Sequence, residues 1–213
     1  MSAQTLEQEL AARDRLYKPS AKKVEVVDAP AMNFLMVDGV GDPNSSQPYM
    51  DALEALYALT YTLKFGLKQA EGVNYRAAPL EGLWWSDAMD VFLAGAREKW
   101  QWTMMIAQPS VVTSEWVERA SEEVRRKKNP PALQLVRFAS FQEGLAAQIM
   151  HIGPYATEAP TIQRLHEFIH AQGGVFDGRV QKHHEIYLGD PRRAAPEKLK
   201  TVIRQPFTQN GYQ

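Results

Sequence analysis

The segment Val40–Pro48, VGDPNSSQP, has a counterpart 112 positions later in Ile152–Pro160, IGPYATEAP. Each copy follows an apolar strand-like stretch and precedes residues with helical spacing, and the apolar positions of the two helices align without a gap. A second match, at a shift of 97 positions, joins Ile106–Pro109 (IAQP) to Ile203–Pro206 (IRQP). The sequence therefore predicts an internal repeat of two modules, each built as strand, helix, strand and strand.

Periodicity and helix-breaking residues place the elements of both modules. Alternating apolar residues predict strands, prolines mark the helix starts, and Gly173-Gly174 ends the second helix. In the first module we expect strands at 34–40, 75–85 and 100–107 and a helix from Pro48. In the second we expect a strand within 133–152, a helix at 160–171 and strands at 184–188 and 200–204. This order predicts an α+β fold, a pseudo-symmetric tandem of the two modules.

The modules are predicted to lie in a single domain of residues 29–213, with the repeats at about 29–110 and 132–207. A helix inserted between them is expected at about 113–130, because Thr113 can cap its start and Pro130-Pro131 stops it. The first 28 residues are expected to form a short, partly helical arm.

Composition limits the class of partner. The 213 residues are 45% hydrophobic, and 24 basic against 25 acidic side chains leave a net charge of −1, which gives no electrostatic signature for nucleic acid or for an anionic membrane. The chain has no cysteine, which excludes a disulfide framework, a thiolate metal site and a cysteine nucleophile. Neither a signal peptide nor an apolar run of membrane-spanning length is evident, so we expect a soluble, cytoplasmic protein.

The most unusual strand is His183–Leu188, HHEIYL. Alternation places Glu185 and Tyr187 on one face of an otherwise apolar strand. An isolated ionised Glu is rarely buried, so this carboxylate needs a cation, solvent or a raised pKa suited to chemistry, and each explanation indicates a pocket. The plainer interpretation is an edge-strand carboxylate paired with Arg204 or His183.

A zinc motif must also be weighed, because His166–His170, HEFIH, satisfies the HExxH pattern of zinc peptidases. The second histidine lies in the last turn before Gly173, where a ligand would be poorly held. The repeat also aligns the two histidines with Glu54 and Ala58 of the first helix, which could not bind a metal. We therefore expect a helix surface here and no metal, and a zinc peptidase is only a remote alternative.

Several ordered blocks carry a resemblance that covers nearly the whole chain. They are Leu16–Pro19 (LYKP), Gly39–Asn44 (GVGDPN), Pro79–Trp85 (PLEGLWW), Met105–Pro109 (MIAQP), His183–Arg193 (HHEIYLGDPRR) and Pro196–Thr201 (PEKLKT). Together they resemble the stand-alone GyrI-like small-molecule-binding proteins, which share the fold of the drug-binding domains of BmrR-type regulators. The resemblance implies a central ligand pocket between the modules, lined by aromatic rings, with a buried glutamate that matches Glu185.

Some members of this family are cyclopropanoid hydrolases, which open the strained cyclopropane of DNA-alkylating antibiotics related to yatakemycin, and others only bind their ligands. As a binder, Glu185 would balance a flat cationic ligand, with cation–π attraction adding about 0.5–2 kcal/mol. As a hydrolase, a desolvated Glu185 with a raised pKa would act as general base on water, while Tyr155 or Tyr187 steadies the developing phenolate. We expect hydrolysis as the leading activity and non-catalytic sequestration or sensing as the alternative, and neither requires a cofactor.

Aromatic residues supply the remaining candidates. Trp84 and Trp85 are adjacent, so they face opposite sides of a strand, and pseudo-symmetry favours Trp85 for the face of Glu185. Trp102 belongs to an aromatic and methionine stripe that is equally typical of a core. The predicted site thus has Glu185 as catalytic residue and, as contacts of a small aromatic or cationic ligand, Tyr155, Trp85, Trp84, Tyr187, Trp102 and His183.

Overall fold

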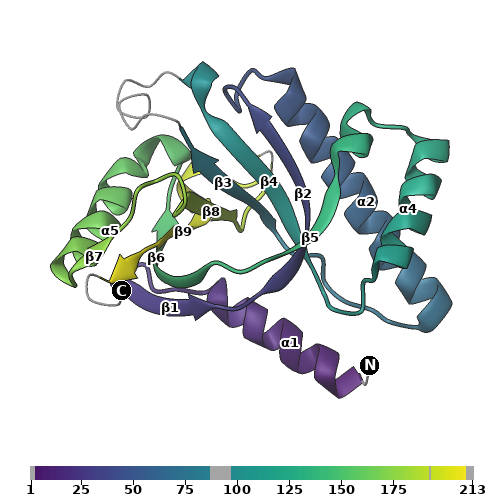
Figure 1. Ribbon diagram of the computed structural model, residues 1–213, viewed down its shortest axis with the longest axis horizontal. Coiled ribbons are helices and arrows are strands. Elements are labelled where there is room, and N and C mark those ends of the chain that lie inside the picture. The colour runs from purple at the N-terminus through teal and green to yellow at the C-terminus, as the bar shows by residue number, and fades with distance from the viewer. Residues whose placement is uncertain (1–2, 87–96, 192, 210–213) are drawn as a thin grey trace.

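The computed structural model describes residues 3–86, 97–191 and 193–209 (Figure 1). Its helices are α1 (Ala3–Leu16), α2 (Gln47–Glu71), α4 (Ser114–Lys127) and α5 (Ala159–Ala171). The strands are β1 (Glu25–Ala29), β2 (Met32–Val40), β3 (Leu80–Trp85), β4 (Gln101–Gln108), β5 (Arg137–Phe141), β6 (Gly144–Ile152), β7 (Gly174–Val175), β8 (His183–Tyr187), β9 (Lys200–Pro206) and β10 (Thr208–Gln209).

Eight of these strands form one antiparallel sheet in the order β1-β6-β9-β8-β3-β4-β2-β5. The first module is β2-α2-β3-β4 and the second is β6-α5-β8-β9, and the two meet where β3 pairs with β8. In Figure 1, α5 lies at the left beside the strands of the second module, and α2 with α4 lies at the right beside the strands of the first. The predicted α+β class and the pair of modules are confirmed, and the seam between them runs through the strand that carries Glu185.

Local sequence explains most of the element boundaries. Thr113 caps α4 as expected, with its hydroxyl accepting a hydrogen bond from the Trp116 backbone N–H. Four strands were not expected: β5 extends the sheet beside β2, β1 pairs with β6 at the opposite edge, and the short strands β7 and β10 pair with each other. The expected strand at 75–85 begins only at Leu80. The division of the chain at residue 28 stays a prediction, although β1 begins at Glu25, before that boundary.

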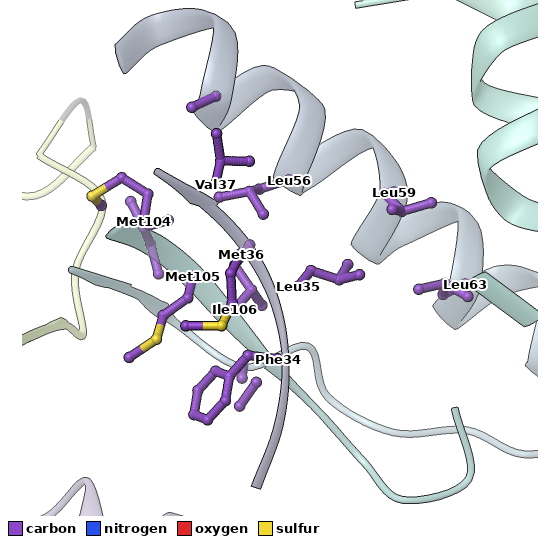
Figure 2. Close-up of a cluster of buried hydrophobic side chains, with 14 of the residues drawn as sticks. Phe34, Leu35, Met36, Val37, Leu56, Leu59, Leu63, Met104, Met105 and Ile106 are labelled. Carbon is purple, nitrogen blue, oxygen red and sulfur yellow. The ribbon is translucent and has the colours of Figure 1, made fainter. Parts of the chain in front are cut away.

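The larger core lies between α2 and the first half of the sheet. Leu56, Leu59 and Leu63 recur at helical spacing and are fully buried against the strand residues Phe34–Val37 and Met104–Ile106 (Figure 2). Helix α4 packs on the outside of α2. This packing fixes α2 over the sheet and so holds one wall of the space between the modules.

A smaller core fixes α5 over the second half of the sheet. Leu165 and Ile169 of α5 are buried against Ile149 and Ile203. On the reverse face of the sheet, Tyr17 at the end of α1 packs on the centre of the second module. None of the helices in the described part of the chain is both long enough and apolar enough to cross a membrane.

Candidate functional site

Strand β8 presents different residues to the two faces of the sheet. The register pairs Gly82 with Glu185 and Trp84 with His183, so these four residues point to the side of the sheet that carries α2 and α5. Gly82 matters because a Cβ at this position would lie 2.8 Å from the indole Nε1 of Trp84. The missing side chain opposite Glu185 therefore gives the Trp84 indole the room to lie across the seam.

A chain of hydrogen bonds holds Glu185 in place. Trp84 Nε1 donates to the Tyr187 hydroxyl at 3.0 Å, and this hydroxyl donates to Glu185 Oε2 at 2.8 Å. The N–H of His183 Nε2 donates to Glu185 Oε1 at 3.1 Å. Burial would raise the pKa of Glu185, but the hydrogen bonds from His183 and Tyr187 and the charge of the imidazole outweigh it, so the pKa is lowered. The expectation of a raised pKa at Glu185 is therefore wrong.

The raised pKa belongs to Glu158, which the sequence analysis did not select. This residue precedes α5 and is only 5% exposed, and its Oε1 has no hydrogen-bond partner in the described structure. Burial, together with the charge of Glu185, raises the pKa of Glu158 to about 8. A signal was present in the sequence: the shift of 112 positions aligns Glu158 with Ser46, the residue before α2. Serine is a common helix cap, whereas Glu is not among the preferred capping residues.

Aromatic rings wall the space above the two carboxyl groups. A groove of about 2830 Å³ lies along α2, α5 and the sheet and reaches residues of α1 and α4, and both Glu158 and Glu185 line it. Pockets for drug-sized ligands have volumes of about 300–1,000 Å³, so one such ligand would fill only part of this groove. The rings that line it include those of Tyr49, Tyr57, Trp84, Trp100, Tyr155 and Tyr187.

The rings also support one another within each module. Tyr49 from α2 stacks on Trp84 with centroids 6.3 Å apart, and Trp100 meets Trp84 edge-on at 6.0 Å. Tyr155 meets Tyr187 edge-on at 5.6 Å. Offset and edge-on pairs of this kind stabilise a packed wall, so the rings offer preformed faces to a flat ligand. We call Trp84, Glu158, His183, Glu185 and Tyr187 the pocket cluster.

The prediction that Trp85 shares the face of Glu185 is wrong, and Trp84 lies there instead. Alternation correctly separated the two tryptophans, but the register between β3 and β8 decides which one faces the pocket. Trp85 points to the other side, where its Nε1 donates to Gln101 at 2.9 Å and the Lys182 ammonium lies 3.4 Å from its ring centroid.

The remaining predicted residues lie near the pocket cluster at different depths. Tyr155 and Tyr187 line the groove, and His183 reaches it through Glu185. Trp102 points to the pocket face but is 1% exposed, beneath Tyr49, and a Cβ at Gly39 would lie 2.2 Å from its ring. Trp102 therefore packs as core behind the wall.

The edge-strand interpretation of Glu185 is half right. Its partner is His183, but β8 is a central strand, and Arg204 points to the reverse face. The histidines of the HExxH segment, His166 and His170, pack on the ring of Phe176. Within the described ranges, no group of three or more His, Cys, Asp or Glu side chains is arranged so that it could hold a metal ion.

Directly behind the pocket cluster lies a second set of polar side chains, the reverse-face cluster of Tyr17, Glu81, Glu143, His184 and Arg204. His184 contacts Glu143 Oε1 through Nδ1 at 2.9 Å and Glu81 Oε2 through Nε2 at 3.1 Å. Arg204 donates to Glu143 Oε2 at 2.8 Å, and the Tyr17 hydroxyl donates to Glu81 Oε1. Two carboxylates thus face two cationic groups, and every carboxylate oxygen has a donor.

Comparisons with known proteins agree with this architecture. An uncharacterized conserved protein from Listeria innocua is 41% identical, with a TM-score of 0.85 over 93% of this chain and 98% of that chain. A hydrolase from Listeria innocua is 38% identical, with a TM-score of 0.80 over the same shares. The C-terminal domain of EcmrR, 10% identical with a TM-score of 0.53 over 88% of this chain and 98% of that chain, shows likeness of fold alone.

No match was found among proteins whose descriptions have been curated. The model of the GyrI-like small molecule binding domain matches residues 22–207, which includes both modules and all of the pocket cluster. The chain therefore belongs to the GyrI-like small-molecule-binding family.

Proposed function

We propose that the pocket binds flat aromatic molecules, often cationic, and that it hydrolyses the cyclopropane of cyclopropanoid DNA-alkylating genotoxins of the yatakemycin type. The observation that carries the proposal is Glu185, held by Tyr187 and His183 at the base of an aromatic groove. Two relatives from Listeria innocua, 38% and 39% identical over 93% of this chain, are described as hydrolases, which supports a hydrolytic activity.

In the proposed reaction, Glu185 acts as the base. A water oxygen bonds to the cyclopropyl CH₂, the strained C–C bond breaks, and its electron pair moves through the conjugated ring to the carbonyl oxygen. The proton of the water passes to Glu185. A lowered pKa keeps this carboxylate ionised at neutral pH. His183 donates to one of its oxygens and Tyr187 to the other, and each oxygen has a further lone pair that can accept from a water.

Tyr155 suits the task of steadying the phenolate. Burial raises the pKa of Tyr155 to about 12, so its hydroxyl stays protonated and can donate. The Tyr187 hydroxyl already donates to Glu185 and accepts from Trp84, so it is better placed to orient the base than to meet the substrate. The pocket is proposed to work without a metal or an organic cofactor.

The test is turnover of an excess of a cyclopropane-bearing alkylator, followed by mass spectrometry as the gain of one water by the ligand. We expect multiple turnovers with the wild-type protein and a loss of at least about 100-fold in Glu185→Gln, the usual size of a general-base contribution. Glu118→Gln, on the exposed side of α4, is the matched control and should turn over normally. A Glu185→Gln variant as active as this control would refute the assignment.

Sequestration is the second candidate, and one observation favours it. Glu185 has a lowered pKa and two hydrogen-bond donors, which suits a fixed counter-charge for a cationic ring as well as it suits a base. A protein that only sequesters would protect DNA in a one-to-one ratio and release the alkylator chemically unchanged. The same mass-spectrometric experiment separates the two candidates.

A further inference from the structure

Glu158 is the buried carboxyl that the proposed mechanism does not use. Its side chain enters the groove that Glu185 also lines, it is 95% removed from solvent, and its Oε1 lacks a hydrogen-bond partner within the described structure. Its side chain makes no capping bond to the backbone of α5. A buried polar atom without a partner is rare in folded proteins and calls for a functional explanation.

The surroundings of Glu158 supply no compensating cation. The titratable groups near it are Glu185 on β8, Tyr155 on the preceding turn and His151 on β6, which contacts Thr161 in the first turn of α5. Lys200 on β9 lines the same groove, but among the described residues no side chain forms an ion pair with Glu158.

Two carboxyl groups in one poorly solvated pocket resist simultaneous ionisation, because like charges repel there. His183 and Tyr187 stabilise the ionised form of Glu185, whereas Glu158 has only the neighbouring Thr201 hydroxyl to lower its pKa, which burial and the charge of Glu185 raise to about 8. At neutral pH the pair therefore carries one negative charge and one proton, and the proton resides on Glu158.

We propose that Glu158 is a second ligand-binding carboxyl of the pocket, and that a cationic aromatic ligand displaces its proton on binding whereas a neutral one does not. The inference rests on the proposed ligand class and not on the hydrolysis. The balance is simple: the cation enters, the O–H bond of Glu158 breaks, the proton leaves to solvent, and the new carboxylate pairs with the ligand. The pocket thereby adjusts its own charge to that of the occupant.

The sign of the pH dependence follows from this exchange. The ionised form of Glu158 binds the cation, and its fraction increases as the pH rises through about 8. The affinity for a cation should rise by up to about tenfold per pH unit between about pH 6 and 8, and should level off above about pH 9. The affinity for a neutral ring of the same shape should stay constant over this range.

The test compares N-methylacridinium, a permanent cation, with acridine, which is neutral from pH 7 upward. Calorimetry in two buffers of different ionisation enthalpy should show release of close to one proton per N-methylacridinium bound at about pH 7, and none for acridine. Glu158→Gln should abolish the proton release and keep acridine binding. Glu167→Gln, on the exposed side of the same helix, is the matched control and should behave as the wild type.

A second measurement does not depend on the variant. In protein labelled with ¹³C at the glutamate carboxyls, one resonance should titrate near pH 8 and should lose this titration when N-methylacridinium is added. If both probes bind with the same pH dependence, or if every carboxyl titrates in the ordinary range, the inference is overturned while the binding function stands. If neither probe binds, the proposed ligand class fails as well.

Discussion

Two polar clusters lie back to back across the centre of the sheet, and they treat their charges in opposite ways. In the reverse-face cluster, Glu81 and Glu143 are matched by His184 and Arg204, and all four carboxylate oxygens have donors. In the pocket cluster, the imidazole of His183 pairs with Glu185, and Glu158 has no ion-pair partner among the described residues. Because neighbouring residues of β8 belong to different clusters, the two environments differ although the strand is the same.

Hydrogen-bond pairing distinguishes a buried charge that stabilises the fold from one that is available to a ligand. A buried carboxylate with complete pairing is satisfied, and nothing remains for a ligand to add. A carboxyl whose oxygen lacks a partner beside a groove, as Glu158 does, is satisfied only when a ligand or a proton arrives. The reverse-face cluster therefore holds the centre of the sheet, and the pocket cluster is left ready for a partner.

The largest effect is expected from removing a cation of the reverse-face cluster. Arg204 is fully buried, and Arg204→Met would leave the two buried carboxylates of the cluster with His184 as their one remaining cation, so we expect the free energy of unfolding to fall by about 3–5 kcal/mol. Urea unfolding measures the change. Arg137→Met, which removes an exposed pair with Asp38, is the control and should cost about 1 kcal/mol or less. Equal losses in the two variants would contradict the comparison.

The reverse-face cluster should also make the stability of the folded protein depend on pH. Burial would lower the pKa of His184, but the charges and hydrogen bonds of Glu143 and Glu81 raise it to about 9. A raised folded-state pKa contributes stability below the unfolded value and loses it as the pH rises to about 9, on the order of 2–3 kcal/mol. Denaturant melts at several pH values should show this decline in the wild type. A His184→Gln variant whose decline is just as steep would rule out His184 as its source.

The pocket cluster should also make the stability of the protein depend on pH, because Glu158 lacks a cationic partner among the described residues. The raised pKa of Glu158 disfavours its ionised form in the folded protein, so the wild type should lose stability as the pH rises from about 4.5, the ordinary pKa of Glu, to about 8, with no further loss above that. Glu158→Gln mimics the protonated acid, and we expect it to be more stable than the wild type by about 1–3 kcal/mol at alkaline pH, with no gain in acid. Thermal melts across this range test the expectation. A variant that is less stable at every pH would refute it.

The smallest effect concerns the two adjacent tryptophans. Trp84→Phe removes the hydrogen bond to Tyr187 and part of the stacked wall, and should weaken the binding of N-methylacridinium by about fivefold to tenfold. Trp85→Phe changes the same residue type on the other face and should leave the affinity nearly unchanged. Fluorescence titration provides the measurement. Equal weakening by both would mean that the ligand does not sit on the Trp84 face.

Much of the fold could be predicted from the sequence. The repeat identified the two modules because duplicated strand, helix and loop signals reinforce one another, and Glu185 was evident because a carboxylate interrupts an apolar strand. The strand β5 was harder, since Arg137–Phe141 has little alternation of its own and is ordered by pairing with β2.

The details of the site depend on how the strands pair, which the sequence does not show. Alternation could separate Trp84 from Trp85, but only the register at the seam between β3 and β8 decides which of them faces Glu185. The pKa of Glu185 was assigned in the wrong direction because burial raises it while hydrogen bonds from His183 and Tyr187 lower it. The sequence shows that these residues share a face, but it does not show that their hydrogen bonds outweigh burial. Glu158 was missed because a single Glu before a helix looks like an ordinary surface residue.

Ser46 and Glu158 occupy equivalent positions in the two modules, but only the second carries a carboxyl group, so the two sides of the pocket differ in chemistry. Duplication supplies two similar halves, yet the carboxyl groups Glu158 and Glu185 both come from the second module, and Tyr49, Trp84 and Trp100 come from the first. An elongated ligand with its charge at one end therefore has these three rings on one side of the seam and the two buried carboxyl groups on the other, and only one of its two orientations places the charge beside the carboxyl groups. A twofold framework thus distinguishes the head of a ligand from its tail.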